Sequence, residues 1–381
     1  MPVPPASRQR LVFTTAAWWK AQMREIDWSL VLMMLVIKAL VLGFAVVSVE
    51  TLFDLEPKWH QMWNRWDAVH YLELAEHGYT APGQNGHESL VFYPLYPWLT
   101  RVAAFFTRDY LAGGLVVSGI ASVASGLLLH RLVALDFPAT VARNAVWFLF
   151  IFPTSYFLHI SYTESLFIAL TLGCLLAART DRWLLAGILV ALACLTRVNG
   201  LLLMPVLAVE VLPRWWKTRR IDWRWLWIGL GVVGFAAYLL LNYQLTGDFF
   251  AFSKIMEKHW FKKFAPPWIG VRDVWLRVFG VNLAEGFHEF FYIVLGFVCT
   301  LWCWIRLRPS YAVWMTLNWL LVNSTSFVLS VPRYTLALFP IFILFADLAT
   351  RRAWFYTIVT VSSLFSLAIF VSRFAQGTWA F

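Results

Sequence analysis

Eleven apolar runs recur along the chain, and they constrain its fold more than any other feature. A helix needs about 20 apolar residues to cross a hydrocarbon core about 30 Å thick. Only 14% of the residues are charged, whereas soluble domains are nearer a quarter charged. The sequence therefore predicts an all-α polytopic membrane protein of about 11 transmembrane helices, forming a single domain over residues 1–381. The runs cover about 28–49, 111–133, 143–160, 163–178, 183–196, 200–212, 225–245, 287–305, 311–331, 335–349 and 354–372.

Three of these runs are too short for a straight crossing. The runs 183–196 and 200–212 flank the motif "TRVNG" and are either tilted half-helices or a re-entrant pair. The run 335–349 is also short and contains Pro340. Broken elements at membrane depth are tolerated only where they are buried in protein or line a water-filled cavity. We therefore expect protein or a cavity beside both places.

The distribution of charge predicts the orientation in the membrane. If the N-terminus lies inside, the inner loops hold a net charge of +10, which equals that of the whole chain. Such a bias is the positive-inside pattern of cytoplasmic loops, and it disfavours a nucleic-acid-binding surface. Two large external loops follow from this orientation, at 50–110 and 246–286, and their aromatic and charged residues predict amphipathic helices on the outer membrane surface. The mixed Trp and basic residues of 11–28 predict a further interfacial helix on the inner surface.

A polar island, "NRWDAVHYLELAEHGY" at 64–79, follows the first apolar run directly. Helical spacing puts Asp67 and His70 on one face and makes Gly78 a natural stop. Trp66, His70, Glu73 and His77 form a second stripe. This stripe matches no strong metal-binding signature, so we expect a polar interfacial face rather than a metal site.

Asp67 is the best candidate for acid–base chemistry. A carboxylate at the outer edge of the membrane can accept the proton of an acceptor hydroxyl while a lipid carrier presents the other substrate. The alternative is a purely structural role at the start of a helix.

Further ionisable residues fall at the outer ends of the predicted spans. Glu164, in "SYTES", is either a site residue or a solvated loop acid. Arg197 and Asn199 lie at the tip of the short pair, where an Arg at membrane depth needs an anionic partner. That partner is either a lipid phosphate or a neighbouring acid. Arg333 and Tyr334 are candidates for contacts with phosphate or sugar.

Two further groups of basic residues are left with open roles. Lys38 lies inside the first apolar run, so it faces the protein interior or a cavity. The lysines of "FSKIMEKHWFKKFAPPW" lie among aromatic residues in the second external loop. They bind either a carrier phosphate or, as the simpler alternative, anionic lipid headgroups.

Several of these motifs together resemble the GPI mannosyltransferase 2 (PIG-V) family and its prokaryotic relatives. The motifs are "RWDAVHYLELAEHGY", "VFYPLYPWLTR", "FPTSYFLHISYTESLF", "LTRVNGLLLMP" and "VPRYTLALFPIF", in the order of the family. Arg65 belongs to the first motif, and Tyr93 in the second stands where the family pattern has Phe. The resemblance implies a GT-C-type glycosyltransferase fold with a catalytic Asp in the first external loop, at the position of Asp67.

The resemblance also implies a donor, an acceptor and a stereochemical course for the reaction. The donor is expected to be a polyprenyl-phosphate hexose, with mannose as the sugar, and the acceptor a lipid-linked glycan or glycolipid at the external or lumenal face. Transfer would be inverting, and the lipid phosphate is a stable enough leaving group that no metal or other cofactor is required. The charge asymmetry and the intramembrane cysteines suit a prokaryotic plasma membrane better than the endoplasmic reticulum. The alternative is a transporter or flippase, which binds its substrate near the midplane.

Overall fold

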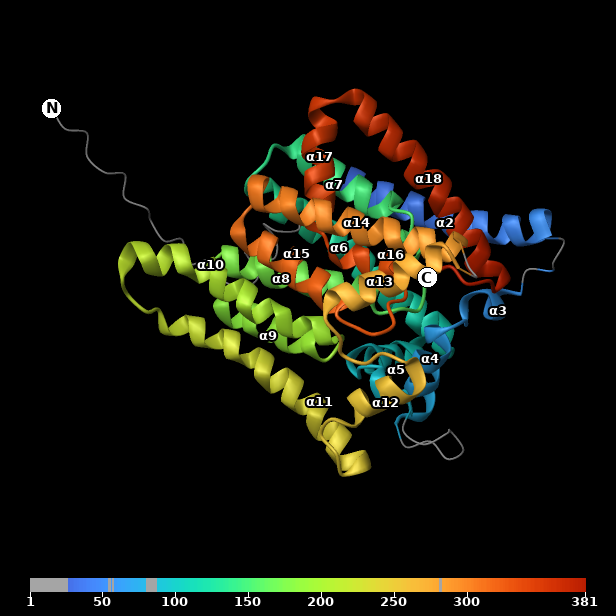
Figure 1. The fold of residues 1–381 in the computed structure, drawn as a ribbon, viewed down its shortest axis with the longest axis horizontal. Helices are drawn as coiled ribbons and strands as arrows, with labels where there is room; N and C mark the ends of the chain where they lie inside the picture. The colour runs from blue at the N-terminus through green and yellow to red at the C-terminus, as the bar shows by residue number, and fades with distance from the viewer. Residues whose placement is uncertain (1–26, 54–55, 57, 80–87, 281–282) are drawn as a thin grey trace.

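The structure, a computed structural model, describes residues 27–53, 56, 58–79, 88–280 and 283–381. Within these residues all regular elements are helices, and one isolated bridge pairs Phe264 with Thr325. The helices, shown in Figure 1, are α2 (Trp28–Phe53), α3 (Trp59–Trp63), α4 (Asp67–His77), η1 (Glu88–Val91), α5 (Leu95–Thr107), α6 (Tyr110–Ala134), α7 (Ala139–Ile151), η2 (Ser155–Leu158), α8 (Glu164–Arg179), α9 (Trp183–Cys194), η3 (Val198–Leu202), α10 (Leu203–Thr218), η4 (Trp223–Gly229), α11 (Leu230–Thr246), α12 (Ala251–Trp260), α13 (Pro267–Val278), α14 (Leu283–Arg306), α15 (Pro309–Asn323), α16 (Val331–Tyr334), η5 (Thr335–Ala337), α17 (Pro340–Arg351) and α18 (Ala353–Gln376).

Each predicted apolar run coincides with a helix, which confirms the all-α membrane fold. Six helical stretches among the described residues are long and apolar enough to cross a membrane, and a seventh is added if a bent pair counts as one span. The six are Trp28–Leu52, Tyr110–Ala134, Val198–Thr218, Trp223–Thr246, Glu285–Arg306 and Ala353–Gln376. The number of eleven crossings therefore stays a prediction.

The chain breaks where the short runs predicted it would. The bent pair joins Val331–Ala337 to Pro340–Arg351 at an angle of 78°. Pro340 is the first residue of α17, where its missing N–H costs no helical hydrogen bond. At the other short pair, α9 has 12 residues, and the 3-10 helix η3 connects it to α10. Together η3 and α10 make a stretch of 21 residues.

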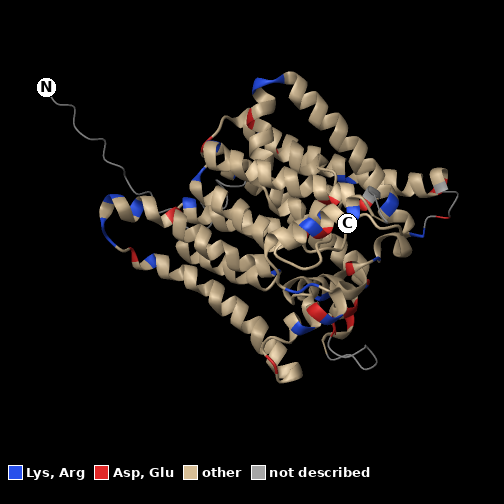
Figure 2. Ribbon diagram, in the orientation of Figure 1, with Lys and Arg blue, Asp and Glu red and all other residues tan. Residues whose placement is uncertain are grey.

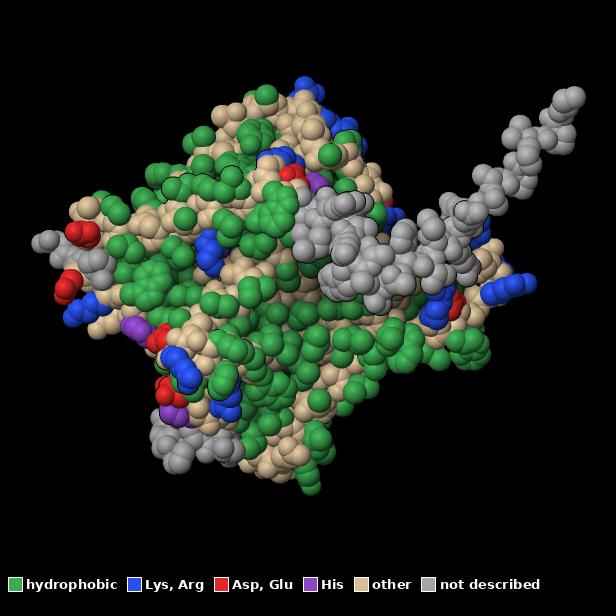
Figure 3. Space-filling view, turned by 180° about the vertical axis from the view of Figure 1, so that it is seen from behind, with side chains coloured by type: hydrophobic (Ala, Val, Ile, Leu, Met, Phe, Trp, Pro, Cys, Tyr) green, Lys and Arg blue, Asp and Glu red, His purple; other side chains and the backbone are tan. Residues whose placement is uncertain are grey.

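Charged residues gather at two sides of the bundle, with an apolar zone between them. In Figure 2 one group follows the α10–η4 turn and the α17–α18 turn, and the other lies around α4, α5 and α12. The helices α11 and α18 run from the first side toward the second. Figure 3 shows hydrophobic side chains covering much of the surface between them. We call the side with α4 and α12 the outer end, because the charge distribution assigns it to the outside.

The salt bridges respect this division. Among the described residues, each salt bridge joins two partners that the sequence assigned to the same side. At the inner end Arg179 pairs with Asp136 at 2.5 Å, and at the outer end His259 lies 3.2 Å from Glu88. The predicted interfacial helix at 11–28 falls almost wholly outside the described residues. The central helix α8 is buried along most of its length, and its first residue, Glu164, lies at the outer end.

Candidate active site at the outer end of the bundle

The polar island forms helix α4, as its spacing predicted. The helix begins at Asp67 and ends before Gly78, whose φ of 78° suits a residue without a Cβ. Trp66 directly precedes it with a φ of 54°, so Trp66 is not helical and does not belong to the predicted second stripe. A carboxylate in the first turn of a helix is stabilised by the helix dipole. The non-helical backbone of Trp66 makes Asp67 the first residue of the helix.

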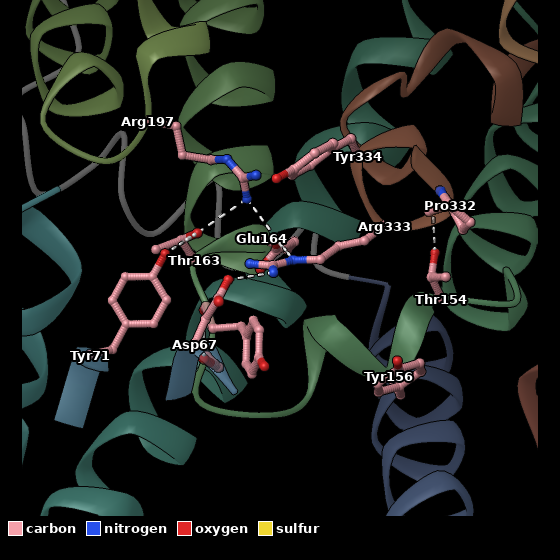
Figure 4. Close-up of polar contacts among 12 residues, drawn as sticks. Asp67, Tyr71, Thr154, Tyr156, Thr163, Glu164, Arg197, Pro332, Arg333 and Tyr334 are labelled. Carbon is pink, nitrogen blue, oxygen red and sulfur yellow. Dashed lines mark hydrogen bonds and ion pairs between the residues drawn. The ribbon is translucent and has the colours of Figure 1, made fainter. Parts of the chain in front are cut away.

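Four charged side chains from four separate segments form one chain of alternating sign, which Figure 4 shows. Arg333 Nη1 donates to Asp67 Oδ2 at 2.6 Å, and Arg333 Nε donates to Glu164 Oε1 at 2.5 Å. Arg197 Nη1 donates to the same Glu164 oxygen at 2.6 Å. We call these four residues the charged cluster. Its members are predicted site residues that lie far apart in sequence.

Burial decides the roles of the two acids. The side chain of Glu164 is only 4% exposed, so the expectation of a solvated loop acid is wrong. Because a buried charge is costly unless it is paired, Glu164 and its two guanidiniums stabilise one another. The anionic partner of Arg197 in this structure is therefore the neighbouring acid, which was one of the two partners expected.

Asp67 is the accessible acid of the charged cluster. Its side chain is 32% exposed, against 6% for Arg333. Among the described residues, Asp67 Oδ1 accepts no hydrogen bond, while Oδ2 is held by Arg333. One oxygen is thus fixed and the other is free to accept a proton.

Aromatic rings lie against the two guanidiniums of the charged cluster, and one of these rings also contacts Lys262 of the second external loop. The Arg333 guanidinium lies 4.5 Å from the centre of the Tyr162 ring. The Tyr334 ring lies 5.3 Å from the Arg197 guanidinium and 5.2 Å from Lys262 Nζ. Lys262 Nζ also donates to the Tyr334 hydroxyl at 3.3 Å. Such contacts between cations and ring faces are stabilising, and they place a third cation at the edge of the charged cluster.

Tyr71 borders the charged cluster but cannot act as its base. Its hydroxyl lies 3.5 Å from Thr163 Oγ1, which accepts from Arg197 at 3.2 Å. Burial, and then the charge of Asp67, raise the pKa of the Tyr71 phenol above its ordinary value. Tyr71 therefore stays protonated at neutral pH, and Asp67 is the more accessible ionisable group of the two.

Four predicted site residues lie beside the charged cluster rather than in it. The Arg65 side chain lies against Gly377, and its backbone carbonyl accepts from Tyr162 Oη at 3.1 Å. The His70 ring stacks on Phe92 at 4.6 Å. Tyr93 is buried and stacks on Tyr238 at 4.0 Å, and Asn199 donates to Asn318 Oδ1 at 2.7 Å. A substrate-binding role for these four residues stays a prediction, and Asn199 lines a small pocket together with Arg197 and Tyr334.

One buried acid at this site was missed by the sequence analysis. Glu289 in α14 is fully buried, and its two oxygens accept the backbone N–H groups of Ser330 and Val331 at 2.7 Å each. An acid within an apolar run was the signal that could have revealed it, because ionisable residues at membrane depth are rare. Among the described residues, no group of three or more His, Cys, Asp or Glu side chains is arranged to hold a metal ion.

Comparison with known sequences finds partial similarity to a mannosyltransferase. No family model matches the chain. The chain is 29% identical over 150 residues to GPI alpha-1,6-mannosyltransferase 2 of Rattus norvegicus and 30% identical to the protein of the same name of Mus musculus. Each match covers 36% of this chain and 29% of the relative. The resemblance inferred from the motifs is thus confirmed, over less than a third of the length of these relatives.

Comparison with solved structures supports the fold over nearly the whole chain. ArnT from Cupriavidus metallidurans, solved bound to undecaprenyl phosphate, aligns with a TM-score of 0.54 and 17% identity. The alignment covers 91% of this chain and 70% of ArnT. The expected GT-C-type fold is therefore confirmed.

Proposed function

We propose that this integral membrane protein is a glycosyltransferase that moves a hexose from a polyprenyl-phosphate sugar to a lipid-linked acceptor at the outer end of the bundle. The observation that carries the proposal is the charged cluster. It presents one exposed carboxylate, Asp67, beside two arginines and Lys262 in a GT-C-type fold. The proposed reaction needs a base and phosphate-binding cations at the outer edge of the membrane.

Asp67 would act as the general base. In the proposed step the acceptor hydroxyl attacks the anomeric carbon, and its proton passes to Asp67 Oδ1. The bond between the anomeric carbon and the phosphate oxygen breaks, and its electron pair stays on that oxygen. A single displacement of this kind inverts the anomeric configuration. Arg333 holds the other oxygen of Asp67 at 2.6 Å, which orients the free one.

The cations beside Asp67 would stabilise the leaving polyprenyl phosphate. Charge on that phosphate grows as the glycosidic bond breaks, and fixed cations in a site with little water stabilise such charge strongly. Lys262 is the best placed to meet it, because among the described residues its ammonium group contacts the ring and hydroxyl of Tyr334 rather than a carboxylate. Arg197 is largely engaged by Glu164 and would contribute a weaker attraction. We propose that this stabilisation replaces a metal ion or other cofactor.

The identities of donor and acceptor rest on the relatives. The partial similarity to GPI alpha-1,6-mannosyltransferase 2 supports mannose as the sugar. The undecaprenyl phosphate bound by ArnT supports a polyprenyl phosphate as its carrier. For the acceptor we propose a lipid-linked glycan or glycolipid, and for the location a prokaryotic plasma membrane with the site facing outside.

Asp67→Asn tests the base directly. This variant keeps the size of the side chain and removes its basicity, so we expect a loss of transfer of about 10²–10⁴-fold in a protein that still folds. The assay is release of polyprenyl phosphate from polyprenyl-phosphate mannose by purified protein with extracted acceptor lipids. Glu76→Gln is the matched control, because Glu76 lies on the same helix and its side chain is half exposed. Full activity in Asp67→Asn would exclude Asp67 as the base.

A deletion strain identifies the acceptor. We expect its lipid-linked glycans to include a species one hexose shorter than the wild-type product. If instead the purified protein moves a sugar or lipid across liposome membranes without breaking a glycosidic bond, the protein is a transporter or flippase and the proposal fails.

A further inference from the structure

The segment that carries Arg333 and Tyr334 is a short helical turn that precedes α17. It comprises Ser330, the four residues of α16 and the three residues of η5, and we call it the 330–337 turn. It lies at the 78° break between α16 and α17. The first N–H groups of any helix lack intrahelical acceptors, and at membrane depth such groups must be satisfied by other parts of the protein.

Glu289 accepts hydrogen bonds from the first two backbone N–H groups of this turn. Its Oε1 accepts from Ser330 N and its Oε2 from Val331 N, both at 2.7 Å. The glutamate is 0% exposed and comes from α14, a separate transmembrane helix. Ser330 has a φ of 70°, a conformation that costs energy for a residue with a Cβ. Glu289 therefore accepts two backbone hydrogen bonds, one from the residue with this costly conformation and one from the residue after it.

The rest of the turn is anchored from other directions. Thr154 Oγ1 donates to the Pro332 carbonyl at 2.9 Å, as Figure 4 shows, and Trp314 Nε1 donates to the Ala337 carbonyl at 2.8 Å. Glu289 thus anchors the first two residues of the turn, and Thr154 anchors the residue directly before Arg333. A shift of Ser330 and Val331 would move the Arg333 backbone, and with it the guanidinium that holds Asp67.

We propose that Glu289 is a positioning residue for the transfer reaction, acting through Arg333 on Asp67. The inference rests on the proposed function, because it assigns Glu289 to the orientation of the proposed base. Glu289 would not touch the substrate. It would fix the start of the turn, so that Arg333 Nη1 reaches Asp67 Oδ2 and Arg333 Nε reaches Glu164 at the same time.

Glu289→Gln is the first test. Glutamine has the same shape, but it offers one acceptor oxygen in place of two and directs an NH₂ group at the second backbone N–H. We expect kcat to fall about tenfold to a hundredfold, because misplacement of a reacting group by about 1 Å costs that much. The KM for the donor should change less than kcat, since Lys262 lies outside this turn and contacts it through Tyr334, on the far side of Arg333 from Glu289. Glu285→Gln, one turn earlier on α14, is the matched control and should keep the wild-type kcat.

Two further variants separate positioning from mere stability. Glu289→Asp keeps both acceptor oxygens, so it should recover part of the lost kcat, and it also serves if Glu289→Gln does not fold. In an Arg333→Lys background, Glu289→Gln should lower kcat by less than in the wild type, because the residue it positions is already altered.

The outcomes are distinguishable. If the wild-type protein releases no polyprenyl phosphate, the proposed function fails. If the wild type is active and both Glu289 variants keep its kcat, only the positioning role fails. The role also fails if the folded Glu289→Gln protein loses thermal stability but not kcat, or if its kcat loss is equally large in the Arg333→Lys background.

Discussion

Replacement of Glu164 by Gln should destabilise the protein far more than an ordinary loss of a salt bridge. Glu164 Oε1 accepts from two guanidiniums, Arg333 at 2.5 Å and Arg197 at 2.6 Å. Glutamine keeps an acceptor of the same shape but removes the negative charge. Arg333 would then retain Asp67 as its only anionic partner among the described residues, and Arg197 would retain a hydroxyl.

The size of the effect follows from burial. The side chains of Glu164 and Arg333 are only 4% and 6% exposed. Removal of one partner from a buried pair costs about 3–5 kcal/mol, whereas an exposed pair contributes about 0–1 kcal/mol. Arg197 is 18% exposed and therefore adds less. We expect a loss of free energy of unfolding of roughly 3–5 kcal/mol, most of it from the loss of the buried pair between Glu164 and Arg333.

The assay is thermal unfolding of purified protein in detergent, with all variants heated at one rate because membrane proteins often unfold irreversibly. The expected loss corresponds to a fall of roughly 5 °C or more in the midpoint. Glu257→Gln is the control, because its salt bridge with Lys263 is exposed on both sides. It should lower the midpoint by about 1 °C at most.

One result would refute this reasoning. If Glu164→Gln and Glu257→Gln lower the midpoint equally, then the two arginines do not depend on the charge of Glu164, and the charged cluster is not an ion-pair network. A second test is the double variant with Arg197→Gln. Because the two residues share one interaction, it should cost less than the sum of the two single variants.

Two further variants test contacts at the edge of the site. Lys262→Met should raise the KM for the donor about tenfold through loss of one charged phosphate contact. The control is Lys263→Met at the exposed neighbouring residue, which should leave the KM unchanged. Equal effects of the two variants on KM in steady-state assays would exclude Lys262 from the phosphate site. Gly377→Ala should destabilise the protein by more than about 1–2 kcal/mol, because its φ is +94° and the new Cβ would also meet Arg65. Gly247 has a φ of +73°, and a Cβ there would meet no atom within 4 Å, so Gly247→Ala should show the backbone cost alone. Equal unfolding midpoints for the two variants would contradict a contribution from the Arg65 contact.

The sequence predicted the members of the charged cluster one at a time. Asp67 stood out because it is an acid in the polar island just after the first apolar run, and Arg197 because an arginine at membrane depth needs a partner. What the sequence could not indicate is which of two partners Arg197 takes. A choice between a lipid phosphate and Glu164 depends on the distance between two helix ends, and local spacing carries no information about that distance.

The same limit explains why Arg65, His70 and Tyr93 were predicted beside Asp67 but lie outside the charged cluster. They share its motifs, yet motif membership gives proximity along the chain rather than the direction of a side chain. Tyr93 stacks on Tyr238 of α11 and the His70 ring stacks on Phe92, so the tertiary contacts of these side chains lie away from Asp67. Glu289 was missed for the converse reason, since its partners are backbone groups 41 and 42 residues away.

By itself the sequence determined the all-helical membrane fold, the separation of charge between two ends, the break near Pro340 and the presence of a helix in the polar island. These features depend on local composition and periodicity, because the cost of burying a polar group in hydrocarbon acts on each segment separately. Only the tertiary structure decided which charges pair, that Glu164 is buried, and that Glu289 holds the turn bearing Arg333. Pairing of buried charges requires side chains within about 3 Å of each other, and only the packing of α4, α8, α16 and the segment between α9 and η3 at one end of the bundle brings them that close.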